Sequence, residues 1–237
     1  ELYHRELDEE PATLLGVHTL PALELTRAGP REAMEELGHA YDRILEVIGD
    51  RFLVLLGGEH AVSAPAILSW ADRGPERLSV LQMDAHADLR PSYEGTPDSH
   101  ASAMARVLPA ADVVAVGVRG VSREEVAVSR AADGSTLIWA EEMQEGDGWM
   151  DRALDALGDR VYLTFDVDYL DPSLMPATGT PEPGGGGWHD TLRFLRRVFR
   201  EKEVVAADVV ELAPIDGLHH PDFTAARLCY EIMGRAG

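Results

Sequence analysis

The sequence predicts an α/β protein, built as a three-layer α/β/α sandwich around a central, mostly parallel sheet. Short runs rich in valine, leucine and isoleucine recur without regular polar alternation, which indicates strands buried on both faces. Segments with helical spacing of apolar residues separate these runs, and such alternation favours right-handed βαβ crossovers. With 237 residues, 45% of them hydrophobic, and no linker or repeat, the chain is expected to form one domain over residues 1–237.

The expected elements follow one another in regular order. Strands are predicted at 52–56, 78–83, 112–118, 136–139, 161–165 and 204–210. Helices are predicted at 30–48, 63–71, 99–107, 122–131, 149–157, 188–200 and 221–234. The first helix begins at Pro30, has Glu32 in its first turn, and places Met34, Leu37 and Tyr41 on one face.

Polar clusters stand at the carboxyl ends of four predicted strands. The sequence GGEH (57–60) follows the first strand, DAHAD (84–88) the second, DVD (166–168) the fifth, and Glu211 the last. Because ligands of parallel α/β sheets bind beyond the carboxyl ends of the strands, we expect these clusters to meet at one edge.

The DAHAD stretch indicates what kind of ligand this edge holds. If the strand continued in extended form, Asp84, His86 and Asp88 would point the same way, about 6.6 Å apart. Two carboxylates this close at the end of a buried strand repel each other and are costly to desolvate. A positive ion between them is therefore expected.

Together the clusters supply four carboxylates and two imidazoles as candidate metal ligands: His60, Asp84, His86, Asp88, Asp166 and Asp168. Four negative charges balance two divalent cations, and two ions about 3.5–4 Å apart can share bridging carboxylates. Oxygen-rich ligation with some imidazole and no thiolate favours manganese over zinc, while iron and cobalt stay open.

Four sequence blocks carry a resemblance to a known family. GGEH, DAHADLRPSYEGTPDSH, FDVDYLDPSLMPATGTPEPGG and DVVELAP resemble, in order and spacing, the signature blocks of the ureohydrolase (arginase/agmatinase) family. The similarity runs from about residue 50 to the C-terminus and is closest to bacterial and archaeal agmatinases. It implies an arginase/deacetylase-like fold, usually assembled as trimers or hexamers, so we expect a homo-oligomer.

The resemblance also implies a binuclear manganese centre with two Mn²⁺ per chain. One ion is assigned His60, Asp84, Asp88 and Asp166, and the other Asp84, His86, Asp166 and Asp168, with Asp84 and Asp166 bridging. In this family a hydroxide that bridges the ions attacks the guanidinium carbon, and urea leaves. By the same resemblance, Asp88 is expected to be catalytic as well as a metal ligand.

Two further residues take roles by resemblance. Glu211 matches the glutamate that binds the guanidinium, because a carboxylate can accept two parallel N–H bonds from that planar group. His100 matches the histidine that passes a proton to the leaving amine. Both are therefore expected to bind substrate and to take part in catalysis.

The spacer LRPSYEGTPDSHASAMARV looks like the agmatinase type. Arginases use an asparagine-containing loop to hold the amino-acid end of their substrate, and this chain has no asparagine. The predicted reaction is hydrolysis of the linear amidine agmatine to putrescine and urea, a step of polyamine biosynthesis. Guanidinobutyrase activity, the less favoured arginase activity, and a catalytically silent paralogue that serves as a binding subunit stay open.

Departures from the family pattern are also visible. Ala61 stands where a serine is usual, and GGGGWHD after PEP is unusual and could shape the pocket. The family normally has an additional N-terminal stretch with a first strand, and we expect this segment to be missing here.

The amino-acid composition limits which classes of molecule the protein is expected to bind. The net charge of −21 argues against nucleic acid and anionic membranes and favours a small cationic guanidino substrate. No apolar run approaches the roughly 20 residues of a membrane span. The single cysteine excludes internal disulfides, so a reducing, cytoplasmic location is expected.

Overall fold

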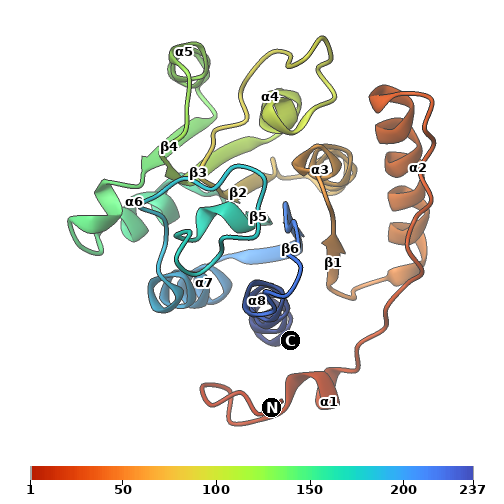
Figure 1. Ribbon diagram of the computed structural model, residues 1–237. Helices are drawn as coiled ribbons and strands as arrows, with labels where there is room; N and C mark the ends of the chain where they lie inside the picture. Colours follow the sequence, from red (N-terminus) through yellow and green to blue (C-terminus); the bar gives the residue numbers. More distant parts are fainter. Residues whose placement is uncertain (1, 237) are drawn as a thin grey trace.

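Six parallel strands form the centre of the computed structural model, which describes residues 2–236 (Figure 1). Their order across the sheet is β1-β6-β5-β2-β3-β4, and every pairing is parallel. The strands are β1 (Leu53–Leu56), β2 (Ser79–Met83), β3 (Asp112–Val118), β4 (Ser135–Trp139), β5 (Arg160–Asp166) and β6 (Glu203–Val210). The predicted α/β fold class is confirmed.

Helices cover both faces of this sheet. On one face lie α2 (Pro30–Ile48), α3 (Ser63–Ala71), α4 (Ala103–Val107) and α5 (Arg123–Ala131), and on the other α6 (Gly148–Ala156), α7 (Trp188–Glu201) and α8 (His220–Ala236). Each face has its own hydrophobic core, because alternate strand residues point to opposite sides: Val80 packs with the α3 side, and Leu81 with the α7 side. The apolar, non-alternating strands thus fit a sheet buried on both faces.

Short elements complete the chain. They are α1 (Pro11–Leu15) and the 3₁₀ helices η1 (His60–Val62), η2 (His100–Ser102), η3 (Glu142–Gln144) and η4 (Val167–Tyr169). The helix predicted at 99–107 is in fact two elements, η2 and α4. They are separate because Ser102, the last residue of η2, has the non-helical φ of −124°. The short α1 was not predicted, because five residues carry too little periodicity.

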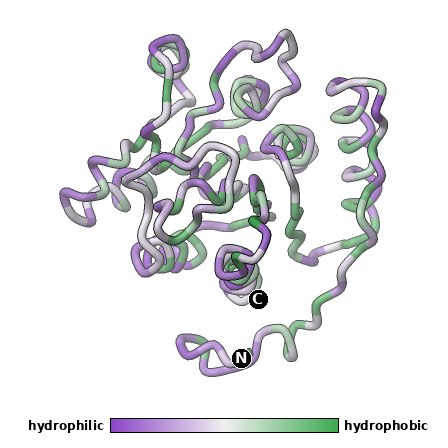
Figure 2. Tube along the Cα trace, in the orientation of Figure 1, coloured by the Kyte–Doolittle hydropathy of each residue, from purple (hydrophilic) through white to green (hydrophobic). Residues whose placement is uncertain are grey.

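The N-terminal residues are attached to the last helix. The Nε2 atom of His4 lies 2.7 Å from a carboxylate oxygen of Glu231 on α8, and both side chains are buried. From α1 the chain runs to α2 through a segment with several hydrophobic positions (Figure 2), of which Val17, Leu20 and Leu23 are exposed. Nowhere in the described chain is there a helix long and apolar enough to cross a membrane.

Candidate metal centre

All six strands run in the same direction, so their carboxyl ends share one edge, and the candidate ligands lie there. His60 begins η1 just after β1, Asp84 follows the last residue of β2, and Asp166 ends β5. Strands β2 and β5 are neighbours in register, with Met83 opposite Phe165. The residue that follows each of these two, Asp84 and Asp166, is therefore brought to the same point.

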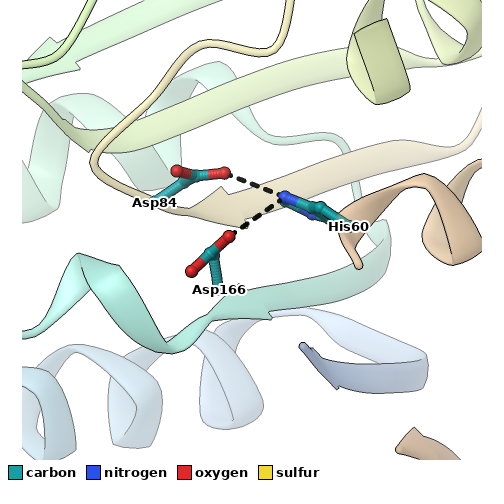
Figure 3. A group of neighbouring side chains, drawn as sticks. All are labelled: His60, Asp84 and Asp166. Atoms are coloured by element: carbon teal, nitrogen blue, oxygen red, sulfur yellow. Dashed lines mark ion pairs between the residues drawn. The ribbon is translucent and has the colours of Figure 1, made fainter. Parts of the chain in front are cut away.

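The first group of side chains is centred on the Nδ1 atom of His60 (Figure 3). Carboxylate oxygens surround this nitrogen: Asp88 Oδ2 at 3.0 Å, Asp84 Oδ2 at 3.1 Å and Asp166 Oδ2 at 3.4 Å. All four side chains are buried. Three strand ends thus direct one imidazole and three carboxylates at a common centre.

The second group shares Asp84 with the first. The Nδ1 atom of His86 lies 3.0 Å from Asp168 Oδ2 and 3.6 Å from Asp84 Oδ1. Asp84 therefore presents Oδ2 to the first group and Oδ1 to the second, the arrangement a carboxylate needs to bridge two ions. The His86 side chain is 24% exposed, so this group lies closer to solvent.

Asp84, His86 and Asp88 do not continue the strand in extended form, so they do not all point the same way. Strand β2 ends at Met83, and Asp88 has the left-handed φ of 52°. The backbone turns at Asp84, because its Oδ1 accepts a hydrogen bond of 2.6 Å from the amide of His86. This turn lets Asp84 and Asp88 reach the same imidazole, while His86 faces Asp168.

The electrostatics of the cluster indicate a deficit of positive charge. Burial, reinforced by the charge of Asp84, raises the pKa of Asp88 to about 7. Burial and the neighbouring carboxylates raise the pKa of Asp166 well above its usual value. Desolvation opposes the charged form of His86, but hydrogen bonds to Asp168 and Asp84 outweigh it and raise the pKa of this histidine to about 11. Protonation in this cluster relieves the repulsion between its buried carboxylates.

The six side chains fit two divalent cations. Within residues 2–236, the Nδ1 atom of His60 has no hydrogen-bond partner, although three carboxylate oxygens face it. A buried nitrogen among acceptor oxygens is what a metal ion would satisfy. Oxygen-rich donors with two imidazoles suit Mn²⁺. That these six residues hold manganese stays a prediction.

Glu211 and His100 lie at the rim of this centre. Glu211 follows β6 with a left-handed φ of 65°, and its Oε1 accepts a 2.6 Å hydrogen bond from the His60 amide. Burial raises the pKa of this half-buried carboxyl, while the hydrogen bond from the His60 amide and the charge of His60 oppose that rise.

His100 is held by Glu59, a residue for which no role was predicted. Glu59 Oε1 accepts from the His100 amide at 3.0 Å and lies 3.1 Å from its Nδ1 atom. The ring of Tyr93 meets the imidazole edge-on, with 5.3 Å between ring centres. The His100 side chain is 44% exposed, so it can reach both solvent and a bound molecule. In the sequence, only the position of Glu59 inside the GGEH block, next to His60, could have indicated a role at the site.

The glycine-rich stretch 184–187 packs against residues 169–171, which directly follow Asp168. Backbone amides of Gly184 and Gly185 donate to Asp171 Oδ2 at 3.0 and 3.3 Å. A Cβ atom at Gly186 would lie 2.4 Å from the Tyr169 ring. Arg119 joins the two segments by donating to the carbonyls of Asp168 and Glu182, at 2.7 and 2.8 Å. The unusual glycines thus allow a close approach beside Asp168.

Comparison with known proteins agrees with this geometry. The profile of the group described as "Arginase family" matches residues 2–234, almost the whole chain. The chain is 35% identical over 241 residues to the N(1)-aminopropylagmatine ureohydrolase of Synechocystis sp., a match that spans 100% of this chain and 78% of that protein. It is 43% identical over 188 residues to the protein of the same name from Thermus thermophilus, a match that spans 79% of this chain but only 63% of that protein.

A solved structure gives the same result in three dimensions. The crystal structure of agmatine ureohydrolase of Thermoplasma volcanium superposes with a TM-score of 0.86 at 25% identity. The alignment covers 100% of this chain and 78% of that one. The resemblance expected from the four sequence blocks is therefore confirmed.

Proposed function

Because this chain belongs to the arginase family of ureohydrolases, we propose that it hydrolyses the guanidino group of a small cationic amine and releases urea. The observation that carries this proposal is the convergence of four carboxylates and two imidazoles at the carboxyl ends of β1, β2 and β5. The family is metal-dependent, and the two side-chain groups that share Asp84 are its candidate metal sites.

The proposed residues divide the chemistry between them. The six ligands would hold two Mn²⁺ ions, which would supply Lewis-acid activation of water. Glu211 binds the guanidinium through charge-assisted hydrogen bonds; one of its oxygens already accepts from the His60 amide, which fixes the carboxylate in place. His100, oriented by Glu59, gives a proton to the amine nitrogen as its bond to the guanidino carbon breaks. The water oxygen leaves in urea.

For the substrate we propose N(1)-aminopropylagmatine first and agmatine second. The Synechocystis and Thermus relatives carry the first name, and the Thermoplasma structure carries the second. Both molecules are linear cations without a carboxylate, which suits a chain of net charge −21. The product would be a polyamine or putrescine, which places the reaction in polyamine synthesis. Assembly as a trimer or hexamer is proposed as well.

Urea release from a panel of guanidines tests this proposal. We expect kcat/KM for aminopropylagmatine and agmatine to exceed that for arginine and guanidinobutyrate at least 100-fold, because a carboxylate without matching donors costs several kcal/mol to bury. Asp84→Asn, which removes the shared carboxylate, serves as the inactive control. Equal efficiency on arginine would overturn the substrate assignment. The absence of urea from every guanidine, with metal bound, would favour a catalytically silent paralogue.

A further inference from the structure

A buried polar pair lies behind His60, on the side opposite the carboxylates. The Nε2 atom of His60 is 2.9 Å from Thr164 Oγ1 on β5, and Thr164 Oγ1 donates to Asp208 Oδ1 on β6 at 2.6 Å. Thr164 and Asp208 are opposite each other in the sheet register, and both are 0% exposed. Neither residue was assigned a role above.

The directions of these hydrogen bonds follow from the chemistry of the groups. Thr164 Oγ1 lies closer to Asp208 Oδ1, at 2.6 Å, than to Ser63 Oγ, at 3.4 Å, so its single hydroxyl proton goes to the aspartate. Thr164 Oγ1 then has lone pairs left and accepts from His60 Nε2–H. A neutral His60 with its proton on Nε2 has a bare lone pair on Nδ1, the atom that faces Asp84, Asp88 and Asp166.

Packing alone does not account for this pair. A valine would fill the space of the fully buried Thr164 without burying a hydroxyl, which is costly. Burying the Asp208 carboxylate is costly, and its Oδ2 atom has no hydrogen-bond partner within the described residues. Thr164 Oγ1, which donates to Asp208, lies 2.9 Å from His60 Nε2. The threonine hydroxyl thus links the buried carboxylate to the histidine.

We propose that Thr164 and Asp208 are positioning residues that fix the ring orientation and tautomer of His60 and so set how tightly the ion beside it is held. The inference rests on the metal site of the proposed function. Mutation of residues that hydrogen-bond to a metal ligand, rather than to the ion itself, typically weakens metal affinity about 10- to 100-fold. The effect should fall on the ion at His60 rather than on the ion at His86.

Calorimetric titration of chelator-stripped protein with Mn²⁺ tests this. Thr164→Val should weaken one of two binding events by about 10- to 100-fold and leave the other within threefold. Thr164→Ser restores the hydroxyl and should bind within threefold of the parent. Asp208→Asn should weaken the same event at least threefold.

Ser79→Ala is the matched control. It removes a buried hydroxyl at the opposite end of the sheet, where Ser79 Oγ accepts from the Gly158 amide at 2.9 Å, and it should leave both events unchanged. The melting temperature of each metal-free variant separates lost affinity from lost folding. If Thr164→Val does not fold, Asp208→Asn carries the test.

The outcomes are separable. Parent protein that binds two ions while Thr164→Val and Asp208→Asn bind equally well would overturn the inference and leave the proposed function standing. An equal weakening of both events, or no recovery in Thr164→Ser, would also overturn it, since a general packing defect acts that way. Parent protein that binds no Mn²⁺ would overturn the proposed function itself and this inference with it.

Discussion

Glu211 is the side chain at which substrate binding can be separated from metal binding. It is not among the six candidate ligands, and its Oε1 atom is fixed by the His60 amide. Glu211→Gln keeps that acceptor but removes the charge that pairs with a guanidinium. The loss of a charged partner in a desolvated site costs about 2–5 kcal/mol. We therefore expect kcat/KM to fall roughly 30-fold to several thousand-fold, at about tenfold per 1.4 kcal/mol.

Kinetics and metal content on the same preparation check this prediction. Glu203→Gln, at the exposed opposite end of β6, is the matched control and should behave like the parent. Activity of Glu211→Gln within threefold of the parent, or a loss accompanied by missing metal, would remove Glu211 from its role.

His100 is predicted to act on the leaving amine rather than on the ions. His100→Ala should lower kcat by about 100- to 10,000-fold, the usual contribution of a positioned proton donor, with metal content unchanged. His39→Ala, an exposed histidine on α2, is the control. Steady-state urea release checks the prediction, and a kcat within fivefold of the parent would contradict it.

At the scale of single residues, the sequence predicted more of the cluster than of its supports. His60, Asp84, His86, Asp88, Asp166 and Asp168 could be predicted, because each stands at the end of an apolar run. The roles of Glu59, Thr164 and Asp208 could not. They depend on hydrogen bonds between segments far apart in sequence, such as the 2.6 Å contact between β5 and β6.

At the scale of elements, the pattern of apolar residues was sufficient to predict where most helices and strands begin and end. The α2 and α3 helices begin and end at the predicted residues; α2 is long and carries a periodic apolar face, whereas α3 is short and mostly buried. Apolar patterning placed the end of β2 at Met83 but not the turn that follows it over residues 84–88. That turn is set by the side-chain-to-backbone bond of Asp84, a local competition that hydrophobic periodicity cannot register.

The close packing of the glycine-rich stretch 184–187 predicts how a substitution there changes the melting temperature. Gly186→Ala would bring a Cβ atom within 2.4–2.8 Å of the Tyr169 ring, which is buried beside Asp168. Overpacking of this kind costs about 1–3 kcal/mol, so the melting temperature should fall by several degrees. Gly148→Ala, with open space around it at the start of α6, should change the melting temperature little. Equal melting temperatures for the two variants would contradict the close packing of this loop.

For the whole molecule, metal binding and pH are linked through the buried cluster. Without metal, the pKa of Asp88 rises from 3.8 to about 7, mainly through burial, and the pKa of His86 rises from 6.5 to about 11. A raised pKa contributes stability below the unfolded value and loses it as the pH rises through the folded value. Metal-free protein should therefore lose this contribution from about pH 4 upward, and further above about pH 6.5.

Bound cations replace those protons, so metal stabilisation should grow as the pH rises. We expect the melting temperature of Mn²⁺-loaded protein minus that of chelator-treated protein to increase from about pH 5.5 to about pH 8.5. Scanning calorimetry at both values checks this. Asp112→Asn, a half-buried carboxylate at the amino end of β3, should leave the pH trend unchanged. A difference that is constant or shrinks with rising pH would contradict the assignment of these side chains to metal.

The dependence of urea release on metal stoichiometry tests the central claim most directly. Chelator-stripped protein is titrated with Mn²⁺, and urea formation from aminopropylagmatine and agmatine is followed at each ratio of metal to chain. If two ions bind side by side and share Asp84 as a ligand, urea release should rise until two equivalents of Mn²⁺ are bound and then stay level. Full activity in stripped protein, or a plateau at one equivalent, would contradict a binuclear centre at the carboxyl edge of this sheet.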